Sequence, residues 1–178
     1  MQENYLISIV GTQEIDGEKD QIELTTVGTY VRKGNSRYIV YHEFNQDLPA
    51  GKVTSVLKVE DDKRVTLIRS GGQRSRLVLE KGKRHLCHYD TGFGSLMVGV
   101  FAQSIHSDLT DSGGTLDVSY SLDINSGLNS MNSIFVDVKR NAEKIIREDR
   151  RKNVKTCSPG NQRFAADHSR PALRAWGP

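Results

Sequence analysis

Residues 65–101 read VTLIRSGGQRSRLVLEKGKRHLCHYDTGFGSLMVGVF, and the prediction of the fold starts from these residues. Runs of apolar and β-branched residues alternate there with glycine turns at Gly71-Gly72, Gly82 and Gly92. Such runs favour strands, and glycine supplies the backbone angles that tight turns need. The stretch therefore predicts three consecutive β-hairpins in the middle of the chain.

The same pattern continues on both sides of this stretch. Residues 115–124 give the cleanest alternation, with an apolar residue at every second position and Thr, Asp or Ser at the others. A period of two is that of a half-buried antiparallel strand. Residues 14–20 predict a polar turn centred on Asp16-Gly17, and residues 125–132 predict a polar connection. Gly28, inside a long strand, predicts a bulge or bend of the kind that barrels need at their corners.

About ten strands are predicted in all, with hairpin-length connections and no strong helix among them. They span residues 6–10, 21–32, 37–44, 53–60, 64–70, 73–80, 83–90, 95–106, 115–124 and 133–139. Short strands joined by turns are typical of a sandwich or an up-and-down barrel. The meander-like order favours the barrel, which also removes exposed sheet edges. We therefore predict an all-β, antiparallel, up-and-down β-barrel of about 8–10 strands.

The length and composition indicate one domain with an appendage. A chain of 178 residues is long enough to bury a core. We place the barrel domain at residues 1–140 and a C-terminal extension at residues 141–178. The extension opens with NAEKIIREDRRK, residues 141–152, which predicts a short helix. Prolines interrupt residues 153–178, so we expect a mostly disordered, flexible tail there.

The chain shows no sign of export or of membrane insertion. It holds no run of about 18 apolar residues, and its first residues, MQENYLISIVG, lack the features of a secretory signal. Cys87 and Cys157 lie far apart and outside any zinc-ligand spacing, so we expect free thiols, no metal and no cofactor. These features favour a cytoplasmic protein.

The basic charge belongs to the extension. Residues 1–140 carry 16 Lys and Arg against 18 Asp and Glu, whereas residues 141–178 carry 9 against 4. The mildly acidic barrel argues against a nucleic-acid-binding face. The extension could bind RNA or an acidic surface. The alternative is a solvated, flexible chain end. The oligomeric state is left open.

Five segments resemble the YwiB-like family of bacterial domains of unknown function. They are LISIVGTQ at residues 6–13, DGEKDQIELTTVGTY at residues 16–30, YIVYHE at residues 38–43, the stretch at residues 65–101, and GGTLDVSYSLDIN at residues 113–125. The resemblance spans roughly residues 4–139, and the extension has no counterpart in it. It implies a calycin-like barrel, the architecture of lipocalins, in a bacterial and cytoplasmic protein. It carries no catalytic residues over to this chain.

The candidate site lies in the central stretch. Arg69 shares its strand face with two apolar residues, so we predict that it points into the barrel, where a guanidinium suits a carboxylate or phosphate. Our hypothesis is that a small anionic or amphipathic ligand is held by Arg69, Ser75, His85 and Tyr89. The alternative places Arg69 at the barrel rim, in water or paired with Glu43 or Glu80.

Three functions remain open from the sequence. The first is a ligand-binding barrel, and the second is a structural or protein-interaction module with a filled interior. The third is an enzyme that uses polar groups at the barrel mouth, but no nucleotide-binding or hydrolase motif is present. A Cys87–His85 catalytic pair would need an activated thiolate beside a base. His85 lies on the same strand face as Cys87, but nothing around the pair looks like an oxyanion-binding device. We therefore assign no catalytic residue.

Overall fold

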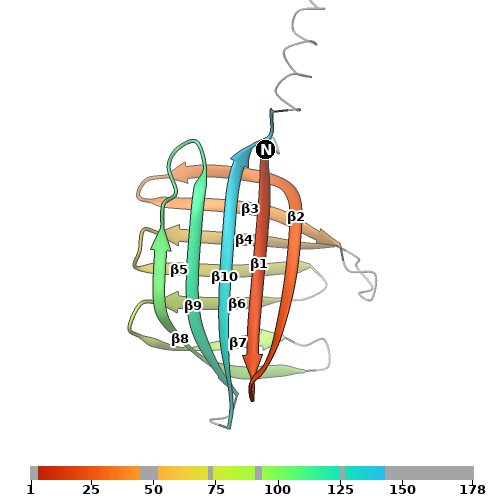
Figure 1. Ribbon diagram of the computed structural model, residues 1–178, viewed down its shortest axis with the longest axis vertical. Helices are drawn as coiled ribbons and strands as arrows, with labels where there is room; N and C mark the ends of the chain where they lie inside the picture. Colours follow the sequence, from red (N-terminus) through yellow and green to blue (C-terminus); the bar gives the residue numbers. More distant parts are fainter. Residues whose placement is uncertain (1–3, 45–51, 72–73, 91–93, 125–126, 143–178) are drawn as a thin grey trace, which may run out of the picture.

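The computed structural model describes residues 4–44, 52–71, 74–90, 94–124 and 127–142. These residues form ten strands: β1 (Tyr5–Ile15), β2 (Glu18–Lys33), β3 (Ser36–Phe44), β4 (Lys52–Glu60), β5 (Arg64–Gly71), β6 (Ser75–Glu80), β7 (Arg84–Asp90), β8 (Ser95–Ser107), β9 (Gly114–Ile124) and β10 (Leu128–Arg140). Each strand pairs antiparallel with its neighbours in sequence, and β1 pairs with β10 (Figure 1). The predicted all-β, antiparallel barrel is confirmed, with ten strands.

The strands cross in two layers. In Figure 1, β1, β8, β9 and β10 run lengthwise, while β3 to β7 are stacked across the back of the barrel. Gly28 is the corner between the layers, because it pairs with Tyr5 of β1 on one side and with Tyr41 of β3 on the other. A Cβ atom at Gly28 would lie 2.4 Å from both Ile7 Cδ1 and the Val40 carbonyl oxygen. Glycine therefore lets the two layers approach at the predicted bend.

The β1–β2 hairpin is longer than predicted. Its turn residues Asp16 and Gly17 have φ values of 51° and 85°, as the predicted tight turn requires. The strands, however, pair right up to that turn, at Ile15 and Glu18. The polarity of residues 14–20 predicts a connection there, and that prediction is wrong. Polar side chains do not prevent a strand here, because the backbone hydrogen bonds continue while the side chains stay in water.

One part of the barrel interior is filled by branched aliphatic side chains. We call it the filled part, and it comprises Ile7, Ile39, Val59, Val65, Leu79, Ile105, Leu116, Val136 and Val138, all nearly inaccessible to solvent. Beside it, the rings of Tyr5 and Tyr30 meet edge to face with centroids 5.3 Å apart. The Tyr30 hydroxyl donates a 2.6 Å hydrogen bond to the Thr110 carbonyl. Aliphatic and aromatic packing therefore leaves no room for a ligand there.

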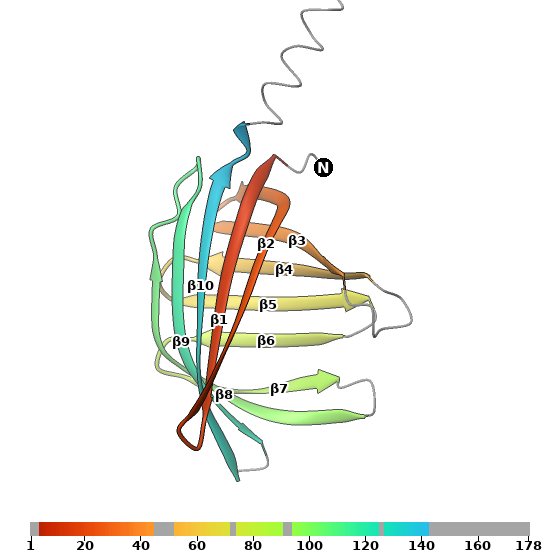
Figure 2. The same ribbon diagram turned by 45° about the vertical axis from the view of Figure 1, so that its right-hand side comes forward.

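The β6–β7 contact is the weakest in the wall. Register pairing between these strands is limited to Ser75 and Tyr89, and an isolated bridge joins Glu80 to Lys83. Between these points the Val78 amide donates to the Cys87 thiol sulfur at 3.4 Å. Cys87 is buried and unpaired. Figure 2 shows β6 and β7 diverging within the stack of β3 to β7. The barrel is thus nearly closed, with the sparsest strand pairing between β6 and β7.

The last strand ends at Arg140, and the Asn141 amide donates to the Asn4 carbonyl at 2.9 Å. The helix predicted at residues 141–152 and the predicted tail fall outside the described residues, as does Cys157. A candidate membrane-spanning helix is not found among the described residues.

Candidate functional site

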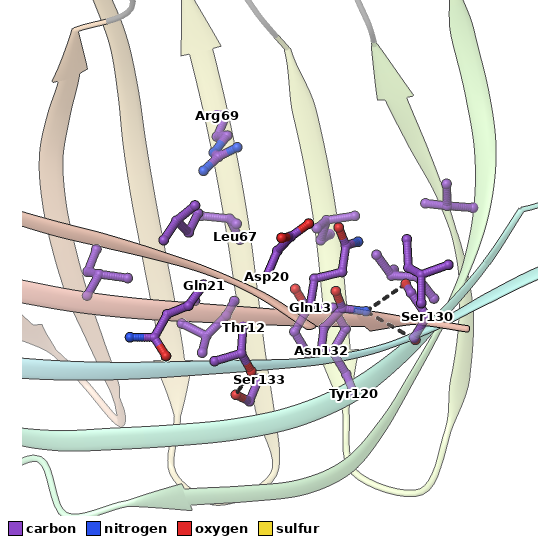
Figure 3. Close-up of a pocket in the computed structure, with 18 of the residues that line it drawn as sticks. Thr12, Gln13, Asp20, Gln21, Leu67, Arg69, Tyr120, Ser130, Asn132 and Ser133 are labelled. Atoms are coloured by element: carbon purple, nitrogen blue, oxygen red, sulfur yellow. Dashed lines mark hydrogen bonds between the residues drawn. The ribbon is translucent and has the colours of Figure 1, made fainter. Parts of the chain in front are cut away.

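A cavity of about 720 Å³ lies within the barrel, away from the filled part. Strands of both layers line it (Figure 3). Ile22 of β2 is one of its lining residues, yet this residue is 72% exposed. The cavity therefore opens to solvent along the β1–β2 hairpin.

Most of the cavity wall is apolar. On the crossing strands, Leu57, Leu67 and Leu77 are successive register partners across β4, β5 and β6. The remaining apolar lining comes from Ile9, Ile15, Ile22, Leu96, Val98, Leu122, Ile124 and Ile134. These residues occupy the inward-facing positions of their strands. For residues 115–124 and 133–139, the period of two predicts these positions. The wall can therefore bury the apolar body of a ligand.

A cluster of polar side chains lies on the wall formed by β1, β2, β9 and β10. Asp20, Gln13, Asn132 and Tyr120 are neighbours in register across these strands. The Asn132 amide nitrogen donates to the carbonyl and hydroxyl oxygens of Ser130 at 3.1 and 2.9 Å (Figure 3). We call Asp20, Gln13, Asn132 and Tyr120 the amide wall. It presents hydrogen-bonding groups and one carboxylate to the cavity.

A second cluster of polar side chains lies on the crossing strands β3 to β6. Tyr41, Ser55, Arg69 and Ser75 are successive register partners from β3 to β6. The Ser55 hydroxyl donates a 2.6 Å hydrogen bond to Glu43 Oε1. Arg69 Nη2 lies 3.5 Å from each oxygen of the same carboxylate. We call this group, with Glu43, the arginine row.

Tyr41 is held in its neutral form by this environment. Burial raises the pKa of its hydroxyl to about 12, and the nearby Glu43 charge adds to the effect. Arg69 and Ser55 act in the opposite direction but do not cancel it. The hydroxyl therefore remains a neutral hydrogen-bonding group across the physiological pH range.

The structure does not bring all four predicted ligand-binding residues together. Arg69 lines the cavity, as predicted, and it is also paired with Glu43, as the alternative held. Ser75 is buried beside Arg69 but is not part of the lining. Tyr89 pairs with Ser75 through its backbone, but its side chain lies outside the described part of the structure. Their assignment to a ligand remains a prediction.

His85 belongs to a different cluster. Its Nε2 atom lies 3.0 Å from Glu80 Oε2, and Glu80 also contacts Lys83 and Arg64 at 2.6 and 3.4 Å. The hydrogen bond from Lys83 is the main cause of a lowered pKa of the Glu80 carboxyl. The side chain of His85 is thus held in an ion-pair network and does not line the cavity. Among the described residues, no group of three His, Cys, Asp or Glu could hold a metal ion.

Sequence reasoning missed the amide wall. It places Asp20 and Gln13 in, or next to, a polar turn, and Asn132 in a polar connection. The signal that could have found them is the period of two itself. Extending it from Ile7 and Ile9 along β1 reaches Gln13, and extending it back from Val136 and Ile134 along β10 reaches Asn132.

Comparison with known proteins assigns the chain to a family. The model of a domain of unknown function, DUF1934, matches residues 7–136. The chain belongs to the DUF1934 family. The matched residues cover nearly the whole barrel, from β1 to β10.

A relative of this chain has a known structure. The uncharacterized β-barrel protein YwiB of Bacillus subtilis (strain 168) is 32% identical over 111 residues, covering 62% of this chain and 75% of the relative. The crystal structure of YwiB from Bacillus subtilis matches with a TM-score of 0.61 and 27% identity, covering 76% of this chain and 91% of that one. The resemblance inferred from the sequence wording is therefore confirmed.

Proposed function

We propose that this DUF1934 protein is a non-enzymatic binding protein that holds a small amphipathic or anionic ligand inside its barrel. The cavity of about 720 Å³ carries the proposal. Ligand sites in proteins are commonly of about 300–1,000 Å³, apolar, with a few well-placed polar groups. The leucine-lined wall would bury an apolar body, and the amide wall and arginine row would meet a polar end.

The same cavity favours binding over a barrel filled with side chains. A structural or interaction module does not need a solvent-open interior. The exposed Ile22, at an inward-facing position, would contribute no packing to such a module. We also infer a calycin-type barrel, supported by the up-and-down order and the open interior. A cytoplasmic location and RNA binding by residues 141–178 remain proposals from composition.

The proposal is tested with the neutral fluorescent probe N-phenyl-1-naphthylamine and a matched pair of variants. Leu122→Trp places an indole in the cavity, whereas Leu86→Trp places the same indole on the exposed outer wall. We expect saturable probe binding by the full chain, weakened about tenfold or more by Leu122→Trp and unchanged by Leu86→Trp. Circular dichroism verifies that both variants are folded.

Two results would reject binding in the cavity. One is the absence of saturable probe binding by the folded protein. The other is equal probe affinity for the two tryptophan variants, which would place the probe outside the barrel. Native mass spectrometry of the purified chain would then identify any small molecule that remains bound.

A further inference from the structure

Arg69 has hydrogen-bonding capacity that Glu43 does not use. A guanidinium carries five N–H donors, but both contacts to Glu43 come from the single nitrogen Nη2. Each is 3.5 Å long, at the outer limit for a hydrogen bond, whereas the Ser55 hydroxyl lies 2.6 Å from the same carboxylate. Arg69 Nε is buried and has no hydrogen-bond partner among the described residues. A buried donor without a partner calls for a specific explanation.

The position of Arg69 supplies one. Its side chain lines the cavity above Leu67, on the layer opposite the amide wall (Figure 3). The Tyr41 hydroxyl, neutral at physiological pH, lies within hydrogen-bonding reach of it. A forked carboxylate or similar planar anion would use the remaining donors of the guanidinium. Arg69 would then join two carboxylates, one from the ligand and one from Glu43.

The charged residues of the amide wall and the arginine row determine how a bound ligand is oriented. Asp20 stands on the amide wall and makes no ion pair within the described ranges. Its side chain is exposed, so water and salt screen its charge. Arg69 is about one-quarter exposed, and charges in such partly desolvated sites interact more strongly. Glu43 is equally buried and offsets part of the Arg69 charge, so the preference for an anionic head group comes from the guanidinium donors that Glu43 leaves unused.

Resting on the binding function proposed above, we propose that the ligand is an amphipathic carboxylate or a related organic anion. Its head group lies against Arg69 and its apolar chain along Leu57, Leu67 and Leu77. Glu43 acts as an internal competitor that partly neutralises Arg69 in the absence of the ligand. The arginine row thereby determines specificity for charge, and the leucine-lined wall supplies the rest of the affinity.

The test uses ligands that differ only in head group. Decanoate, 1-decanol and decylamine share one alkyl chain and carry an anionic, a neutral and a cationic head. Each is titrated against the full chain holding N-phenyl-1-naphthylamine. We expect decanoate to displace the probe at concentrations about tenfold or more below those needed for 1-decanol, because a hydrogen bond to a charged group contributes more than a neutral one.

Variants of the arginine row assign this preference to Arg69. Arg69→Gln alone would leave the Glu43 carboxylate without its counter-charge, so the double variant Arg69→Gln/Glu43→Gln keeps the row neutral and protects folding. We expect the folded double variant to bind decanoate and 1-decanol with equal affinity. Glu43→Gln alone should raise affinity for decanoate severalfold. Asp20→Asn is the control and should raise it less.

The possible failures are distinguishable. If the neutral probe does not bind, the binding function itself is wrong. If the probe binds but decylamine competes best, or the three head groups compete equally, the cavity binds ligands and the assignment of an organic anion is wrong. Retention of the decanoate preference in the folded double variant would also overturn the role of Arg69.

Discussion

The same strands build two unlike interiors. At one end of β1 and β10, Ile7, Val136 and Val138 are inaccessible to solvent and belong to the filled part. Towards the other end of these strands, Gln13 and Asn132 line the cavity. Both sets occupy inward-facing positions in one continuous register. Facing inward is therefore not the same as being packed. Branched aliphatic side chains occur at both ends, and the cavity end adds glycine and polar residues to them.

The physical reason is the size and polarity of the inward residues. Branched aliphatic side chains fill the space between the layers at native density, which leaves no room for water. Glycine at position 11 and the amide wall leave space unfilled, and their polar groups tolerate water in it. Stability and binding are thus separated along the barrel. Substitutions can test that separation.

The largest effect is expected in the filled part. Ile39 is fully buried between its register partners Tyr30 and Leu57. Ile39→Ala should lower the free energy of unfolding by about 2–5 kcal/mol, because it removes apolar contacts and leaves a cavity. Urea unfolding followed by circular dichroism measures the loss.

The matched control for Ile39→Ala is Leu122→Ala, since Leu122 faces the existing cavity. Its cost should be less than half as large, because that side chain already borders open space. Similar losses for the two variants would mean that the cavity wall contributes to stability as much as the filled part does. The separation between the two parts would then be wrong.

A smaller effect is expected at Tyr41, which lies between the two parts. Its pKa is about 12 in the folded chain and about 10 when unfolded. Above pH 10 the unfolded chain loses a proton that the folded chain keeps, so stability falls as pH rises from 10 towards 12. The Tyr41 contribution to this loss should be about 1 kcal/mol at pH 11 and approach about 3 kcal/mol above pH 12.

Urea unfolding at pH 9 and pH 11 measures this dependence, with Tyr41→Phe as the comparison. The phenylalanine variant should lose less stability between the two pH values than the parent chain does. Burial also raises the pKa of Tyr30, so part of the loss should remain in the variant. An identical pH dependence in both proteins would show that Tyr41 is not buried as described.

Much of this architecture could be predicted from the sequence. The alternation in residues 115–124 predicts which side chains of β9 face the interior, and Asp16-Gly17 predicts the first hairpin turn. Gly28 gave the corner, since only a residue without a side chain fits beside Ile7 there. These features are local, and local patterns carry periodicity and turn chemistry directly.

The site was harder to predict because it depends on which strands cross. Arg69 was placed inside the barrel by the alternation of its own strand. The alternation of residues within β7 also assigns His85 to a strand face. Its contact with Glu80, however, depends on the irregular pairing of β6 and β7, which the alternation does not contain. The contact between Arg69 and Glu43 joins β5 to β3 across β4, and no periodicity within one strand contains that information.

The smallest effect on stability is expected at Ile22, where the comparison between the two parts is sharpest. Its side chain faces inward at a register position opposite Gly11, yet it remains mostly exposed at the cavity opening. Ile22→Asn should change the free energy of unfolding by less than about 0.5 kcal/mol, as for other exposed positions. Affinity for N-phenyl-1-naphthylamine should nevertheless fall severalfold, because the substitution removes apolar surface from the opening. Urea unfolding and probe titration on one preparation measure both quantities. A stability loss as large as that of Ile39→Ala would show that the opening closes in solution, and the two ends of the barrel would then differ far less than their side chains indicate.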